Sequence, residues 1–396
     1  MTLPPLPPQL MELVRLVIAL LLVFIFMPLN TLVMVYAERK IMAFMQDRLG
    51  PYHTGKWGTL QLIADTLKLL VKEDFVPGRV DKILHLAAPL IFFAPVVGGF
   101  VVLPFAQNLV AADLNVGLLF VVALGSTGTI GIVTAGWASN NKYSALGAMR
   151  AAAQMVSYEI PMVLSLVAIV MMTGTLSLTG IVQAQGQYWF FLIQPLAFLT
   201  YFVCALAETN RNPFDLPEAE SELVAGNMTE YSGMRWAMFF LGEYGNMVIV
   251  SAIAATLFLG GWQGPVLPGL VWFLIKLYFL QFVFIWIRAT LPRLRADQLM
   301  EFSWKGLIPL TLLNIGITGI VVLLFPTGYE LPLGVLSWLM LIGFIVLLPR
   351  IERSVLHARA RARGRLRTGG VARAAGAGSD LEPARSPRAT EGALRR

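Results

Sequence analysis

The segment AETNRNPFDLPEAESELVAGNMTEY, residues 207–231, is the most acidic passage of a chain that is otherwise strongly apolar. Apolar runs of membrane-spanning length flank it at residues 188–207 and 236–261. The segment therefore predicts a polar loop between two membrane helices. It holds one basic residue, Arg211, and six carboxylates: Glu208, Asp215, Glu218, Glu220, Glu222 and Glu230.

The prolines of this loop predict its local structure. Pro213 and Pro217 disfavour helix on either side of three residues, so we expect a turn and then a short helix that begins at Glu218. On that helix Glu218 and Glu222 share a face, and Glu220 is turned away. Carboxylates this close together are not expected to be ionised all at once.

The composition indicates an all-α polytopic membrane protein. Of 396 residues, 57% are hydrophobic and only 13% are charged, which excludes an ordinary soluble domain. The single cysteine, Cys204, excludes disulfides and cysteine-ligated zinc or iron-sulfur centres within the chain. His53 and His85 are isolated, so no metal site is predicted. The N-terminus lacks the basic region of a cleavable signal peptide, and no phosphate-binding glycine loop is present.

About nine apolar segments have the length that a hydrocarbon core of about 30 Å requires. The last is the weakest of them. They lie near residues 11–36, 84–105, 116–136, 149–174, 188–207, 236–261, 266–287, 306–325 and 332–349.

The basic residues predict the orientation in the membrane. Nine spans place the loops alternately on two faces, and 28 of the 30 Lys and Arg residues fall on one of them. By the positive-inside rule this face is cytoplasmic and the N-terminus is outside. The acidic loop, residues 208–235, therefore lies inside the cell. The connection RATLPRLRADQ carries Arg288, Arg293 and Arg295 on the same face and could offset its charge.

The first cytoplasmic loop, residues 38–82, predicts an amphipathic helix over residues 59–73, after turns at several glycines. Its apolar face holds Leu60, Ile63, Leu67 and Leu70, and its polar face Gln61, Asp65, Lys68 and Lys72. The helix is too short and too charged to span a membrane. One interpretation is a helix in the lipid headgroup region, and a compatible one is the rim of an opening for an apolar ligand.

Three carboxylates lie at or within predicted spans: Glu159, Glu208 and Glu243. Glu243 is nine residues from Met234, hence about 13 Å along a helix. A carboxylate at such a depth is costly unless it is paired, protonated or hydrated. Each could be an isolated structural residue, but together the three favour a proton relay.

The chain from residue 351 to 396 is basic, rich in glycine, alanine and proline, and free of aromatic residues. This composition predicts a disordered cytoplasmic tail that contacts anionic lipid or partner proteins. Nothing in it favours nucleic-acid binding. Residues 1–350 then form the transmembrane domain.

Four runs of sequence closely resemble one known family, the H-type membrane subunit of respiratory complex I, the proton-pumping NADH:quinone oxidoreductase. The resemblance covers about residues 11–350, and only the basic tail departs from it. The chain length and the tail favour a bacterial inner membrane. The runs are ERKIMAFMQDRLGPYHTGKWGTLQLIADTLKLLVKE, SALGAMRAAAQMVSYEIPM, AETNRNPFDLPEAESELVAGNMTEYSGMRWAMFFLGEY and RATLPRLRADQLM.

The resemblance implies a subunit without a redox centre that forms most of a tunnel for ubiquinone or menaquinone. It implies partner subunits that carry the flavin and iron-sulfur clusters, and antiporter-like membrane subunits. Residues implied to line or flank the tunnel are Arg39, Asp65, Lys68, Arg211, Phe214, Asp215, Glu218, Glu220 and Glu222. Those implied to begin a proton path toward the antiporter-like subunits are Glu159, Glu208 and Glu243.

Two alternatives stay open. One is the equivalent subunit of a membrane-bound hydrogenase or ferredoxin-driven complex, which resembles the same family. The other is a secondary transporter that works alone, although the chain has no visible inverted repeat and no matching pair of broken helices.

Overall fold

The computed structural model describes residues 8–216, 225–326 and 328–346. Within these residues the secondary structure is helical, and no β-strand is formed. By their contacts the residues form two units, Met1–Trp338 and Leu339–Arg396. Apart from the second half of the helix Glu330–Val346, all features described below lie in the first unit. The predicted helix from Glu218 and the predicted tail from residue 351 fall outside the described residues.

Seven helices of the described chain are long and apolar enough to cross a membrane, and two shorter apolar helices, Pro195–Glu208 and Glu330–Val346, coincide with the remaining predicted segments. The all-α polytopic fold is thus confirmed, while the number of spans stays a prediction. The seven are α1 (Pro8–Met45, apolar from Val17), α3 (Lys82–Phe100), α4 (Gly117–Ala138), α5 (Lys142–Thr173), α10 (Gly233–Phe258), α11 (Gly269–Thr290) and the run α12 (Ala296–Glu301), η3 (Phe302–Leu307) and α13 (Ile308–Leu324).

Two helix boundaries differ from the predicted ones, because a capping residue begins one helix earlier and a proline begins another. The predicted span 149–174 begins earlier, because the Asn141 side chain accepts a hydrogen bond from the Tyr143 N–H and starts α5 at Lys142. The predicted span 188–207 is divided into α7 (Phe190–Ile193) and α8 (Pro195–Glu208). Pro195 occupies the first position of α8, where its missing N–H costs nothing.

The predicted amphipathic helix is present as α2, Gln61–Val71. Leu62 packs inward, whereas the four predicted apolar side chains Leu60, Ile63, Leu67 and Leu70 are 50–58% exposed. The apolar face of α2 therefore points away from the rest of the chain, as both interpretations of this helix require.

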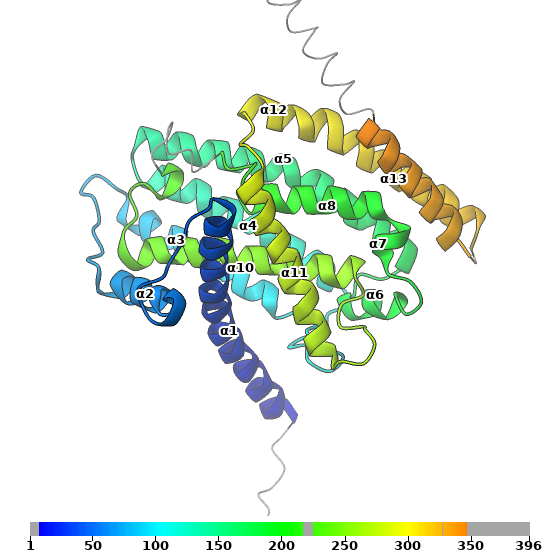
Figure 1. Cartoon of the computed structure of the whole chain (residues 1–396), viewed down its shortest axis with the longest axis horizontal. Coiled ribbons are helices and arrows are strands. Elements are labelled where there is room, and N and C mark those ends of the chain that lie inside the picture. The colour runs from blue at the N-terminus through cyan, green and yellow to red at the C-terminus, as the bar shows by residue number, and fades with distance from the viewer. Residues whose placement is uncertain (1–7, 217–224, 327, 347–396) are drawn as a thin grey trace, which may run out of the picture. The chain divides into compact units, whose positions relative to one another are not determined.

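Helix α10 lies at the centre of the first unit and contacts α1, α3, α8 and α11 (Figure 1). Most of the apolar part of α10 is buried within the chain, whereas only a minor part of α1 is. Its position matters because Glu243 lies on it. A second set of contacts joins α5 to α4, α8 and α13, and Glu159 lies on α5.

Candidate functional site

Glu38 is the centre of a buried ionic cluster made by four separate parts of the chain. It lies near the end of α1 and is 4% exposed. Nη1 of Arg211 lies 3.2 Å from both of its carboxylate oxygens, and Arg288 of α11 forms a second ion pair with Oε1. The Tyr244 hydroxyl of α10 donates a hydrogen bond to Oε2, at 2.7 Å. Glu38 thus joins α1, α10, α11 and the acidic loop.

Arg211 is held on the opposite side by an aromatic ring. Its guanidinium lies 4.3 Å from the ring centroid of Tyr244, a cation–π contact. Burial alone lowers the pKa of Arg211, but Tyr244, Glu38 and Glu243 together raise it above its usual value. Arg211 is therefore protonated at every physiological pH, and the charge of Glu38 is compensated by two arginines.

A cavity of about 230 Å³ opens beside this cluster, and we call it the ionic cavity. Asn210 and Asn212 add amide groups to its wall, and the apolar side chains Val35, Met42 and Phe240 complete it. The charged and phenolic side chains that line it are Glu38, Arg39, Arg211, Asp215, Glu243, Tyr244 and Arg288. Four of these were named from the sequence as tunnel or proton-path residues, namely Arg39, Arg211, Asp215 and Glu243, and Arg288 was named as a base that could offset the charge of the acidic loop.

The amphipathic helix reaches the ionic cavity through one ion pair. Asp65 accepts a hydrogen bond from Arg39 at 2.7 Å and another from Gln61 at 3.1 Å, and the Arg39 and Asp65 side chains are 45% and 34% exposed. Lys68 lies one turn further along α2, is exposed, and is not among the lining residues of the cavity. Asp65 thus acts on the cavity through Arg39.

The acidic loop is anchored to α5 by a glutamine. Nε2 of Gln154 donates to the carbonyl oxygens of Ala207 and Phe214, both at 2.7 Å, and Gln154 is fully buried. Phe214 is also buried and packs edge-on against Tyr158 with ring centroids 5.2 Å apart, so it faces α5 and not the cavity. The remaining predicted residues of the loop, Glu218, Glu220 and Glu222, lie outside the described residues.

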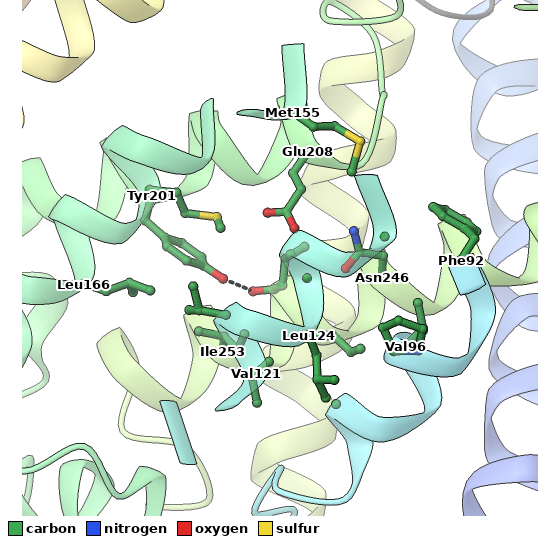
Figure 2. Close-up of a pocket in the computed structure, with 18 residues that line it drawn as sticks. Phe92, Val96, Val121, Leu124, Met155, Leu166, Tyr201, Glu208, Asn246 and Ile253 are labelled. Atoms are coloured by element: carbon green, nitrogen blue, oxygen red, sulfur yellow. Dashed lines mark hydrogen bonds between the residues drawn. The ribbon is translucent and has the colours of Figure 1, made fainter. Parts of the chain in front are cut away.

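Glu208 lies in a second space, between α3, α4, α5, α8 and α10, which we call the glutamate pocket (Figure 2). The pocket is about 40 Å³, room for a few water molecules. Its wall is apolar except for three groups, Glu208, Asn246 and Tyr201. Tyr201 donates to the Val250 carbonyl at 2.9 Å, while Oε2 of Glu208 has no hydrogen-bond partner within the described chain. A water molecule is the natural partner for that oxygen.

Glu159 and Glu208 meet at neighbouring residues of α4. The Ser126 hydroxyl is hydrogen-bonded to Oε1 of Glu159. A Cβ built on the preceding residue, Gly125, would lie 3.2 Å from Oε1 of Glu208. The missing side chain at Gly125 therefore leaves space for one carboxylate while the next residue binds the other.

The ionic cavity and the glutamate pocket are connected by two pairs of residues that are three positions apart in the sequence. Glu243 lines the cavity and Asn246 the pocket, and residues three apart share one face of α10. Glu208 lines the pocket and Arg211, three residues later, lines the cavity. Glu243 thus lies in the ionic cavity with Arg211 and Arg288, whereas Glu208 lies in the glutamate pocket, near Glu159.

Sequence reasoning missed Glu38, Gln154 and Tyr244 as parts of the site. Glu38 is adjacent to Arg39, yet it reads as one more polar residue of a charged loop. Gln154 and Tyr244 are single polar groups within apolar runs, and such groups need a partner when they are buried. A polar residue within an apolar run therefore indicates a buried hydrogen bond, but the sequence does not show which residue is its partner.

No group of three or more His, Cys, Asp or Glu residues that could hold a metal ion occurs in the parts of the chain that the structure describes. His85 is fully buried and stacks on Tyr231, with ring centroids 4.0 Å apart. Its Nδ1 lies 3.1 Å from Nη1 of Arg235, which also pairs with Asp74 at 2.9 Å. His85 therefore has a packing role that joins separate parts of the chain.

Comparison with known proteins gives one consistent result. The family model described as NADH dehydrogenase matches residues 18–319. The H subunit of NADH-quinone oxidoreductase from Geobacillus sp. (strain WCH70) is 54% identical over 297 residues, which cover 74% of this chain and 89% of that protein. The first of the H subunits of this enzyme from Geobacter sulfurreducens is 52% identical over 332 residues, 78% of this chain and 95% of the relative. The H subunit from Dehalococcoides mccartyi is 48% identical over 340 residues, which cover 86% of this chain and 96% of the relative.

Proposed function

Because this chain belongs to the NADH dehydrogenase family and is an H-type membrane subunit of NADH-quinone oxidoreductase, we propose that its ionic cavity receives the quinone headgroup and that its buried glutamates carry protons away from it. In this proposal the electrons arrive from partner subunits that carry flavin and iron-sulfur clusters. The chain itself supplies the binding surface and the proton path. The relatives' names favour this function over the equivalent component of a hydrogenase and over the independent transporter.

The observation that carries the proposal is the lining of the ionic cavity. Its volume of about 230 Å³ approaches the lower end of small-molecule sites, about 300 Å³. Arginine and tyrosine can donate hydrogen bonds to the carbonyl oxygens of a quinone, and Val35, Met42 and Phe240 can contact its ring. The combination of apolar walls and a few directed donors is typical of cofactor and substrate sites.

The proton chemistry follows from the charges of the cavity. Reduction of a quinone to a quinol consumes two electrons and two protons. Before protonation the reduced headgroup is negative, so it attracts Arg211 and Arg288 and competes with Glu38 for them. A shift of these arginines changes the electrostatic potential at Glu243 and Glu208, which can then release or take up a proton.

The glutamate pocket supplies the next step of the path. An unpartnered oxygen of Glu208 faces a space of a few water molecules, and Asn246 and Gly125 border the same space. Glu159, bonded to Ser126, lies beyond it. The proposed order is therefore Glu243, Glu208 and Glu159, with water between the carboxyl groups.

The cavity is tested with Tyr244→Phe in the assembled enzyme. This change removes the hydroxyl that holds Glu38 but keeps the ring beneath Arg211. We expect a severalfold higher KM for quinone and an unchanged rate of NADH oxidation with an artificial acceptor that takes electrons from the cytoplasmic arm. An equal effect on both reactions contradicts a quinone site here. Tyr143→Phe, at an exposed tyrosine outside the cavity, is the matched control.

A further inference from the structure

Pro161, two residues from Glu159, leaves one backbone carbonyl of α5 without its usual hydrogen-bond donor. It lies within α5, and proline has no N–H to donate to the carbonyl four residues earlier, which is that of Ser157. Ser157 is 3% exposed, so bulk water does not reach it. A buried carbonyl without a partner destabilises the helix that contains it.

The missing donor comes from a different helix. The Ser303 hydroxyl donates to the Ser157 carbonyl at 2.6 Å, and Ser303 is fully buried. The indole N–H of the next residue, Trp304, donates to the Ser157 hydroxyl at 3.3 Å. Both donors lie in η3, a π-helical turn, a rare conformation that often marks functional sites.

The segment that carries Ser303 is also tied to the acidic loop. The Leu294 N–H donates to the carbonyl of Pro213 at 3.1 Å, and the Tyr158 hydroxyl donates to the carbonyl of Leu299 at 2.9 Å. Residues 294–304 therefore contact the loop beside the ionic cavity at one end and α5 beside Glu159 at the other.

From these contacts we infer that Ser303 is a positioning residue for Glu159, because it replaces the hydrogen bond that Pro161 removes and so fixes the part of α5 that sets Glu159 against Ser126. The inference rests on the proposed role of Glu159 in proton transfer. A movement of the acidic loop reaches Glu159 through residues 294–304. This part of α5 can adjust because the hydrogen bond to the Ser157 carbonyl comes from a side chain and not from the helix itself.

A double-mutant cycle in the assembled oxidoreductase tests this inference. We expect Ser303→Ala to lower kcat about tenfold and to leave the KM for quinone unchanged, since loss of one donor to a buried carbonyl is an effect of this size. Ser303→Thr keeps the hydroxyl and should retain most of the rate. Pro161→Ala restores a backbone N–H at this position, so in that background Ser303→Ala should have little further effect.

Ser165→Ala is the matched control, because the Ser165 hydroxyl is also buried in α5 but donates to the Met162 carbonyl of its own helix. An equal loss from Ser303→Ala in both backgrounds overturns the inference, and so does a wild-type rate for Ser303→Ala. If Ser303→Ala does not assemble, assembly on a native gel becomes the measured quantity. Recovery of assembly in the double variant then supports the inference, and failure in both backgrounds overturns it.

Glu159→Gln, measured in parallel, separates two different failures. Full proton pumping in Glu159→Gln contradicts the proposed proton path. Full activity of Ser303→Ala in an enzyme that Glu159→Gln inactivates contradicts only the positioning role of Ser303.

Discussion

Arg211 forms hydrogen bonds of 3.2 Å with both carboxylate oxygens of Glu38, although 173 residues separate them. This contact fastens the acidic loop to the end of α1, and Tyr244 and Arg288 complete it from α10 and α11. A buried charge of this kind is stable only with its partners, so the cluster defines one arrangement of the four elements. The cavity that we propose for quinone exists because these elements meet at Glu38.

Arg211→Ala should destabilise this region by about 3–5 kcal/mol, because it leaves a buried carboxylate with one arginine instead of two. The expected result is less assembled complex and a lower temperature of heat inactivation. Arg48→Ala, at an exposed arginine of the first loop, is the control. A heat-inactivation profile of Arg211→Ala equal to that of the control would show that the ion pair contributes little.

The effect of Arg211→Ala should not depend on pH. The folded-state pKa of Arg211 is raised above its ordinary value, which is already far above physiological pH, so its stabilising contribution is fully present below that ordinary value and is lost only at still higher pH. We expect a constant difference between variant and wild type from about pH 6 to about pH 9. A difference that changes with pH within this range would contradict the assignment of the effect to the charge of Arg211.

Asp65→Ala should raise the KM for quinone more than Lys68→Ala does. Asp65 holds Arg39 at the wall of the ionic cavity, whereas Lys68 is exposed one turn away on the same helix. Stability should hardly change, since partly exposed ion pairs contribute about 0–1 kcal/mol. Steady-state kinetics with quinone, compared with electron input to an artificial acceptor, measures the effect. Equal KM values for the two variants would mean that α2 acts at the entrance through its general charge.

Gly125→Ala should impair proton pumping, because the new methyl group would lie 3.2 Å from Oε1 of Glu208. Gly128→Ala is a close control on the same helix, since its nearest neighbour, the Phe92 ring, lies at an ordinary distance of 3.8 Å. Both changes favour helix equally. Protons pumped per electron should therefore fall only in Gly125→Ala, and an equal fall in both would assign the effect to helix packing.

Much of the fold could be predicted from the sequence because it depends on local properties. Apolar runs located the helices, and Pro195 explains afterwards why one predicted span is divided. The amphipathic pattern of α2 correctly grouped Leu60, Ile63, Leu67 and Leu70, whose side chains face away from the chain, but it did not single out Leu62, which packs inward. These features need no knowledge of which helices are neighbours.

The site was only partly predictable because it depends on contacts between distant segments. Carboxylates in apolar runs identified Glu159, Glu208 and Glu243 as unusual, but spacing alone did not show that Glu243 belongs with the arginines. The partners of Glu38 come from positions 211, 244 and 288, and no local pattern connects them. The same holds for Ser303, which becomes meaningful only when the carbonyl of Ser157 lies beside it.

The central claim, that quinone reduction and proton transfer meet at the buried glutamates, is tested most directly by Glu208→Gln. NADH:quinone activity and proton pumping are measured in membranes that carry this single change, and assembly is checked on a native gel. Glu230→Gln is the control, because Glu230 belongs to the same loop but bonds to Asn141 outside both cavities. We predict that both activities of Glu208→Gln are lost in an intact complex. Wild-type activity and pumping in that complex would contradict the claim.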